Sequence, residues 1–316
     1  MESPFNSEAL QGKVALITGG GSGIGFEIAT HFGKHGAKIA IIGRRKSVLD
    51  EAVEKLSSQS IQALAIEGDV RKEEDAKRAL DSTVAKFGKL DILVNGAAGN
   101  FLCLAEDLSV NAFRTGRRFF FLFFLFLFFC FISSNTEKKN AVLEIDTVGT
   151  YNMSHHAMHY LKSGAPGKKS GEGGLIINIT ATLQFSAAWF QTHLVSAKAA
   201  IDSMTRNLAL EWGKDYNIRV NAIAPGPIKD TPGMSKLAPD EINIRDSPPW
   251  GEKWDIAMTA IFLASSAGKY VNGAIIPVDG GAWFHRPPHF PKETIRSLSR
   301  VVEKRSRVGS NTKSKL

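Results

Sequence analysis

The chain has 316 residues, of which 43% are hydrophobic and 22% are charged; this composition excludes a disordered chain and supplies a sizeable core. Its two cysteines, Cys103 and Cys130, exclude a disulfide framework and favour a reducing intracellular setting. The net charge of +8 is local, because residues 116–141 carry +3 and residues 292–316 carry +6, which leaves −1 for the remainder. We therefore expect no nucleic-acid partner.

Short apolar runs alternate with stretches of helical periodicity along most of the chain. Strands are expected at residues 13–18, 38–42, 63–66, 91–94, 175–179, 218–223 and 274–278. Helices are expected at residues 24–33, 48–57, 73–87, 195–212 and 258–265. The alternation predicts one doubly wound α/β domain over residues 1–291, with a parallel sheet and helices on both faces.

A glycine-rich loop joins the first predicted strand to the first predicted helix. Glycines at such a junction let the backbone approach a pyrophosphate at the helix N-terminus. The alternative is a plain tight turn, but strand, loop and helix follow in the order that a dinucleotide site requires. The expected cofactor-binding residues of this loop are Gly19, Gly20, Gly21, Ser22, Gly23, Ile24 and Gly25.

The ends of the next two strands bear on the choice of cofactor. An NAD enzyme would carry an acidic residue after the second strand, whereas this chain has Arg44 and Arg45. Guanidinium groups there favour the 2′-phosphate of NADPH, although two solvated arginines would give the same sequence. After the third strand, Asp69, followed by Val70, is a candidate acceptor for the adenine amine; its alternative role is to cap the next helix.

Four motifs together resemble the short-chain dehydrogenase/reductases: residues 18–25, 95–99, 196–198 and 225–228. The resemblance implies a single Rossmann-like domain that assembles as a homo-oligomer, a tetramer or dimer. It also implies that Lys198 holds the nicotinamide ribose and that Asn95 lies beside the cofactor. The segment expected to cover the nicotinamide contains Pro225, Gly226, Pro227, Ile228 and Thr231.

The chain departs from that family at its chemical centre. Leu194 stands four residues before Lys198, where the family has a proton-donating Tyr. Ala181 takes the place of the usual Ser, and Asp146 that of the usual Asn. These departures, with residues 95–103 and 177–183, are similar to peroxisomal 2,4-dienoyl-CoA reductases. The final Ser-Lys-Leu, residues 314–316, is a peroxisomal address that the import receptor would read.

The subgroup resemblance implies NADPH-dependent reduction of a fatty 2,4-dienoyl-CoA to a trans-3-enoyl-CoA, in the β-oxidation of unsaturated fatty acids. No alkoxide forms in this reaction, so no Tyr is needed to protonate one. Asp146 is implied as the acid, acting through an ordered water, together with Lys198 and Thr182. The alternatives are that Asp146 only orients Lys198 or caps a turn, and that Lys198 lies on a solvated helix face.

Substrate-binding residues are also implied by resemblance, and Phe101 has ordinary core packing as its alternative. The candidates are Arg44, Arg71, Phe101, Ser109, Val110, Asn111 and Lys236. His155, His156 and His159 have helical spacing, but no fourth ligand accompanies them, so no metal site is expected.

Residues 116–141 interrupt the pattern and hold nine of the 20 phenylalanines. Their apolar run, residues 119–132, would span roughly 21 Å as a helix, so no transmembrane span is expected. Without the interruption, residues 111–115 and 142–146 would join into one amphipathic helix that ends at Asp146. We therefore interpret the segment as translated intron, with a membrane-peripheral loop as the alternative. The basic tail, residues 292–316, is expected to be a solvated end.

Two alternatives to the leading function stay open. One is another enoyl or carbonyl reduction on the same fold. The other is a catalytically impaired isoform that carries the insertion as a retained intron.

Overall fold

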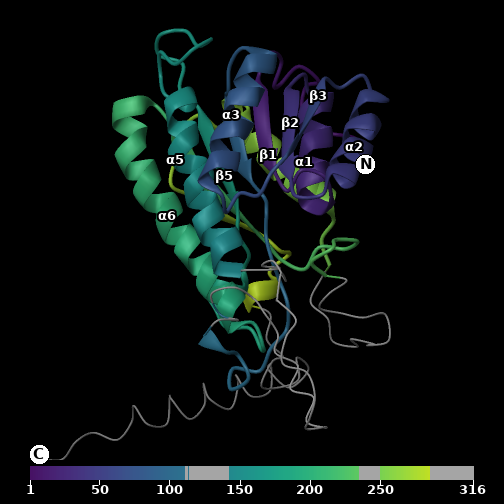
Figure 1. The fold of residues 1–316 in the computed structure, drawn as a ribbon, viewed down its shortest axis with the longest axis vertical. Helices are drawn as coiled ribbons and strands as arrows, with labels where there is room; N and C mark the ends of the chain where they lie inside the picture. The colour runs from purple at the N-terminus through teal and green to yellow at the C-terminus, as the bar shows by residue number, and fades with distance from the viewer. Residues whose placement is uncertain (111–112, 114–141, 235–249, 285–316) are drawn as a thin grey trace, which may run out of the picture. The chain divides into compact units, whose positions relative to one another are not determined.

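The computed structural model describes residues 1–110, 113, 142–234 and 250–284 (Figure 1). The interruption at 116–141, the tail at 292–316 and the Ser-Lys-Leu end lie outside the described residues. The substrate candidates Asn111 and Lys236 lie outside them too. Residues Met1–Trp283 form one compact unit, which contains the whole sheet.

A parallel sheet of seven strands has the order β3-β2-β1-β4-β5-β6-β7. The strands are β1 (Val14–Thr18), β2 (Lys38–Gly43), β3 (Ala63–Glu67), β4 (Ile92–Asn95), β5 (Leu175–Ile179), β6 (Arg219–Pro225) and β7 (Ile275–Val278). All six strand pairs are parallel. This confirms the predicted doubly wound sheet, and every predicted strand is present within two residues of its expected ends.

Helices cover both faces of this sheet. They are α1 (Gly23–Lys34), α2 (Lys46–Ser57), α3 (Glu73–Phe87), α5 (Gly149–Leu161), α6 (Thr192–Tyr216) and α7 (Lys253–Ala264). One apolar cluster joins the sheet to α1, α2 and α7, and a second joins it to α3, α5 and α6. Figure 1 shows α3, α5 and α6 gathered on one face.

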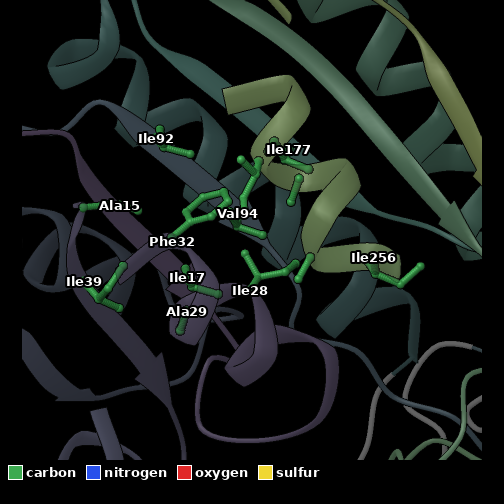
Figure 2. Close-up of a cluster of buried hydrophobic side chains, with 14 of the residues drawn as sticks. Ala15, Ile17, Ile28, Ala29, Phe32, Ile39, Ile92, Val94, Ile177 and Ile256 are labelled. Atoms are coloured by element: carbon green, nitrogen blue, oxygen red, sulfur yellow. The ribbon is translucent and has the colours of Figure 1, made fainter. Parts of the chain in front are cut away.

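Successive strand residues alternate between these two clusters, as the pleat requires. Ile17 faces the first cluster and Leu16 the second. All five residues of β1 are buried, because both faces of the sheet are covered. Figure 2 shows the first cluster, in which Phe32 of α1 packs among side chains from β1, β4 and α7.

The helix that contains Asp146 continues well beyond that residue. A π-helical turn, Glu144–Val148, leads directly into α5, which ends at Leu161. The prediction that this helix ends at Asp146 is therefore wrong. The continuation depends on Gly149, where an added Cβ would lie 2.6 Å from Val70 Cγ2, so a glycine lets the helix approach the end of β3. Wide π-helical turns often occur at functional sites.

A buried polar network holds the middle of the sheet against α5 and α6. The Asn95 amide donates to Ser154 Oγ (3.0 Å) and to Asn178 Oδ1 (2.9 Å). Asn178 in turn donates to Thr205 Oγ1 at 2.9 Å. These side chains are buried, so their pairing fixes the register of β4 and β5 relative to the helices.

Candidate active site

The candidate site lies at the carboxyl ends of β1 and β4, where the strand order reverses direction. Ligands of open α/β sheets bind at such a switch point. Thr18 Oγ1 accepts hydrogen bonds from the main-chain N–H groups of Gly96 and Ala97, both at 3.0 Å. The loops that follow β1 and β4 are thus held together at the predicted motifs.

The glycine-rich loop has the geometry of an anion cradle. Gly19 has a φ of +69°, and a Cβ on Gly25 would lie 2.6 Å from the Gly19 carbonyl oxygen. The N-cap of α1, Ser22, makes no side-chain capping bond, and the first turn holds no acidic residue. Its backbone N–H groups and helix dipole therefore suit a pyrophosphate, so the residues present fit a dinucleotide.

Arg44 and Arg45 are exposed at the end of β2, and Arg45 is the N-cap of α2. Burial raises the pKa of Asp69, but hydrogen bonds from Arg71 and the charges of Arg71 and Arg44 outweigh it and bring the pKa below its ordinary value. Arg44 therefore lies close enough to influence the end of β3. An exposed guanidinium pair at this position fits an anionic group on the cofactor ribose.

The Asp69 carboxylate is hydrogen-bonded to Arg71, two residues later in the chain. Arg71 Nε donates to both Asp69 carboxylate oxygens at 2.9 Å, and the Arg71 main-chain N–H donates to Oδ1 at 3.1 Å. The alternative that Asp69 caps α3 is wrong, because Lys72 is the N-cap. The carboxylate of Asp75 instead reaches back and accepts from the Asp69 N–H at 2.9 Å. Val70, between the pair, is buried.

The chemical centre is an ion pair between Asp146 and Lys198. Asp146 Oδ1 lies 2.8 Å from Lys198 Nζ, and Oδ2 accepts from the Gly99 N–H at 2.8 Å. Lys198 Nζ also donates to the Ile179 carbonyl at 3.0 Å. Both side chains are buried, so the alternative that Lys198 lies on a solvated helix face is wrong.

Burial raises the pKa of the Asp146 carboxyl, although the Lys198 charge and the hydrogen bonds from Lys198 and Gly99 oppose this. A carboxyl with a raised pKa in a dry site can hold a proton that an exposed carboxyl would release. The pair therefore has both a cation and a candidate proton source in one place.

Leu194, at the position of the family Tyr, is buried and packs with Val142 and Ala197, against Phe101 and Leu183. An apolar contact therefore replaces a proton donor here. Thr182 is buried, and its N–H donates to the Pro225 carbonyl at 3.1 Å. This bond ties the loop after β5 to the loop after β6.

The loop after β6 returns toward the glycine-rich loop. The Gly226 N–H donates to the Val278 carbonyl at 3.0 Å, and Ile228 pairs with Gly251 as an isolated bridge. Thr231 Oγ1 donates to the Ile228 carbonyl at 3.0 Å, which closes a turn. A Cβ on Gly23 would lie 3.1 Å from Pro232 Cδ, so the two loops meet at that point.

The other substrate candidates are spread along the loop after β4. The Phe101 ring stacks on His193, with ring centroids 3.8 Å apart and planes 16° from parallel. Phe101 also packs against the Leu194 cluster. It therefore makes the core contacts of its alternative role while lying on the loop expected to border the acyl-CoA channel. Ser109 and Val110 are exposed, and the Ser109 carbonyl accepts from the Phe113 N–H at 2.8 Å.

Three contacts at the site were not predicted from the sequence. The Gly99 N–H is a backbone group, which no residue type signals. His193 is fully buried, and its ring stacks on that of Phe101. Asp202 accepts from Gln184 Nε2 at 2.8 Å and so anchors the turn after Thr182. Its position one helical turn after Lys198 is the signal that could have found it.

The described part of the chain holds no group of three His, Cys, Asp or Glu side chains that could bind a metal. His156 Nε2 lies 3.3 Å from Glu73 Oε1, and His155 stacks on Tyr151. Within the same described ranges, no helix is both long enough and apolar enough to cross a membrane.

Two family models match the chain: "short chain dehydrogenase" over residues 13–116 and "Enoyl-(Acyl carrier protein) reductase" over residues 129–283. The chain is 58% identical over 313 residues to an Arabidopsis thaliana peroxisomal 2,4-dienoyl-CoA reductase, covering 97% of this chain and 96% of that protein. It is 40% identical to the mouse protein of that name, covering 90% and 88%. A probable 2,4-dienoyl-CoA reductase of Bacillus subtilis is 34% identical over 88% of this chain and 100% of its own length.

Solved structures agree with the fold. A short chain dehydrogenase from Bacillus anthracis superposes with a TM-score of 0.69 at 35% identity, covering 88% of this chain and all of its own. A putative short-chain alcohol dehydrogenase from Sinorhizobium meliloti gives 0.73 at 26% identity, covering 89% and 100%. The chain belongs to the short-chain dehydrogenase/reductase family of oxidoreductases, which use a nicotinamide cofactor. Within that family, its sequence groups it with the 2,4-dienoyl-CoA reductases.

Proposed function

We propose that this protein uses NADPH to reduce 2,4-dienoyl-CoA to trans-3-enoyl-CoA. The observation that carries the proposal is the buried ion pair of Asp146 and Lys198. This centre keeps the family's cation, has the apolar Leu194 in place of the family's hydroxyl donor, and has a carboxyl in place of the family's Asn. Such a centre suits protonation at carbon rather than at an alkoxide oxygen. The Arabidopsis and mouse relatives carry the same activity in their names.

When bound, the nicotinamide would supply a hydride to C5 of the conjugated acyl chain. The C4–C5 and C2–C3 double bonds are lost, one forms between C3 and C4, and a proton is added at C2. Lys198 binds the nicotinamide ribose and places positive charge near the developing dienolate. Asp146 holds the proton and passes it through an ordered water, while the Thr182 hydroxyl donates to the thioester oxygen.

We propose that three parts of the site bind the cofactor. Residues 19–25 cradle the pyrophosphate, Arg44 and Arg45 pair with the 2′-phosphate, and Asp69 with Val70 borders the adenine. Asp69 Oδ1 and Oδ2 are shared with Arg71, so the adenine contact competes with that pair. The Asn95 amide nitrogen is committed to the buried network. The segment that covers the nicotinamide comprises Pro225, Gly226, Pro227, Ile228 and Thr231.

For the substrate, we propose that Arg44 and Arg71 pair with CoA phosphates and that Phe101, Ser109 and Val110 line the acyl-CoA channel. Asn111 and Lys236 remain in this proposal, although they lie outside the described residues. Arg71 can serve only if its bonds to Asp69 are shared with the phosphate or exchanged for it.

We further propose that the protein acts in the peroxisome, as a tetramer or dimer, in β-oxidation of unsaturated fatty acids. The import receptor would read residues 314–316. Residues 1–291 make up the NADP-binding domain and residues 292–316 a basic tail. The Arabidopsis and mouse relatives are named as peroxisomal, which supports the location.

A purified-protein assay tests the function. The full chain is mixed with NADPH and 2,4-hexadienoyl-CoA, and absorbance of NADPH is followed. We expect consumption of NADPH with the dienoyl-CoA and none with simple ketones. Turnover of ketones, without turnover of the dienoyl-CoA, would favour the second candidate, a carbonyl reductase.

The impaired-isoform candidate is favoured by the place of the interruption. Val142, the first described residue after it, is fully buried, and Asp146 follows four residues later. We expect that deleting residues 116–141 raises soluble yield and turnover. If deletion abolishes both, the segment is integral and not a translated intron. A continuous exon across these codons in the genomic locus would also end the intron interpretation.

A further inference from the structure

Three large apolar side chains stand exposed where two loops of the site meet. Leu104 is 45% exposed, Trp189 84% and Phe190 45%, and the Trp189 and Phe190 ring centroids lie 6.0 Å apart. We call these three residues, two aromatic and one aliphatic, the aromatic rim. Single exposed apolar side chains are common, but a group of them beside a ligand site marks a binding surface.

The backbone of the rim is held in an unfavourable conformation. Phe190 has a φ of +62°, which bulky side chains rarely adopt. Its carbonyl accepts a hydrogen bond from the Cys103 N–H at 2.9 Å, and this bond ties the two loops together. Strained residues of this kind gather at ligand clamps, so the conformation calls for a functional explanation.

The rim is continuous with the catalytic centre along both loops. The first loop begins at Gly99, whose N–H binds Asp146, and reaches Leu104 five residues later. Five residues span at most about 18 Å. Midway, the Phe101 ring stacks on the fully buried His193, which lies on the helix of Lys198. A long acyl chain that passes the Phe101 ring would follow this loop to the rim, and our proposal is that a six-carbon chain ends before it.

We propose that the aromatic rim binds the methyl-end half of long acyl chains and so sets the chain-length preference. The inference rests on the proposed function in taking an acyl-CoA as the substrate. Three side chains supply far less than the roughly 800 Å² per partner of a stable protein interface, which disfavours a second copy as the occupant. Glu106 and Asp107 lie two and three residues after Leu104 and are exposed, and their negative charge disfavours an anionic membrane surface.

The main test compares two substrate lengths on the full chain. Removing the indole in Trp189→Ala should lower kcat/KM for a 16-carbon 2,4-dienoyl-CoA about tenfold, because the acyl chain loses much of its apolar contact with the protein. The value for 2,4-hexadienoyl-CoA should stay within about twofold. Tyr270→Ala is the matched control, because Tyr270 is a 99% exposed aromatic outside the site; both values should be unchanged. Phe190→Gly, which accepts the positive φ, should act in the direction of Trp189→Ala.

A binding measurement separates this inference from the proposed function. Palmitoyl-CoA and hexanoyl-CoA are titrated into the protein with NADP⁺ by calorimetry, since neither can be reduced at C5. If Trp189→Ala weakens the binding of palmitoyl-CoA but not that of hexanoyl-CoA, the result supports the proposed role of the aromatic rim even if wild-type protein shows no turnover. Equal weakening of both ligands, or of neither, overturns it. A lower sedimentation mass for Trp189→Ala would also overturn it, because the rim would then join copies of the chain.

Discussion

Asp146→Asn tests the central side chain with almost no change of shape. In the structure, the two carboxylate oxygens face two donors, Lys198 Nζ and the Gly99 N–H, each at 2.8 Å. An amide has one oxygen, so its NH₂ group must face one of these donors in either orientation. The lost bond costs about 1–3 kcal/mol of unfolding free energy, offset in part because a buried carboxylate is itself unfavourable.

The expected kinetic effect is larger than the effect on stability. Removing a general acid lowers kcat by about 10²–10⁴-fold. NADPH affinity should change by less than about threefold, because Lys198 keeps its bond to the Ile179 carbonyl. The assay measures kcat with 2,4-hexadienoyl-CoA and the dissociation constant of NADPH by fluorescence. Asp50→Asn is the control, since Asp50 pairs with Lys46 at 2.6 Å on the exposed surface.

The pH dependence gives a second readout for the same change. Because burial raises the Asp146 pKa, the protonated form contributes stability that is fully present below the unfolded pKa and lost as pH rises through the folded one. Turnover that needs this proton should fall over the same rise in pH, and Asp146→Asn should abolish that dependence. The acid role is refuted if Asp146→Asn keeps kcat within about tenfold of wild type. It is also refuted if NADPH affinity falls in parallel with kcat, which would make Asp146 structural.

Three further predictions test other parts of the site and fold. Gly25→Ala should weaken NADPH binding by at least about tenfold, because the new Cβ would lie 2.6 Å from the Gly19 carbonyl; unchanged affinity in a fluorescence titration would exclude the cradle. Arg45→Glu, at the arginine assigned to the cofactor alone, should lower kcat/KM for NADPH by about 100-fold and leave that for NADH within about threefold, whereas an equal fall for both cofactors would exclude a 2′-phosphate contact. Burial lowers the pKa of Lys168 to about 8, so unfolded protein binds more protons than folded protein above that pH, and urea unfolding should show stability rising between about pH 8 and 10. Lys168→Gln should flatten that rise, and a variant with the wild-type slope would contradict the assignment.

The sequence predicted most of the fold because buried parallel strands have a strong local signal. β5 and α3 have the predicted bounds, since β5 begins directly after Gly174 and α3 ends directly before Gly88. The helix through Asp146 was predicted too short. Thr147, Val148 and Gly149 are weak helix formers, and tertiary packing on Val70 overrides them.

The site could be predicted only at the level of residue types. Lys198 and Asp146 stand out in the motifs, but their partners Gly99 and Ile179 contribute backbone groups that have no sequence signal. The pairing of Asp69 with Arg71 is another example. From the sequence, Asp69 was expected to bind the adenine and Arg71 a CoA phosphate. In the structure, the two side chains are hydrogen-bonded to each other.

The most direct test of the proposed reaction is the position of hydrogen in the product. The full chain is incubated with NADPH and 2,4-hexadienoyl-CoA in D₂O, and the product is analysed by NMR. We expect a trans-3-enoyl-CoA with one solvent deuterium at C2 and the hydride from NADPH at C5. A trans-2-enoyl-CoA, or deuterium at C5 in place of the NADPH hydride, would contradict the proposed reaction.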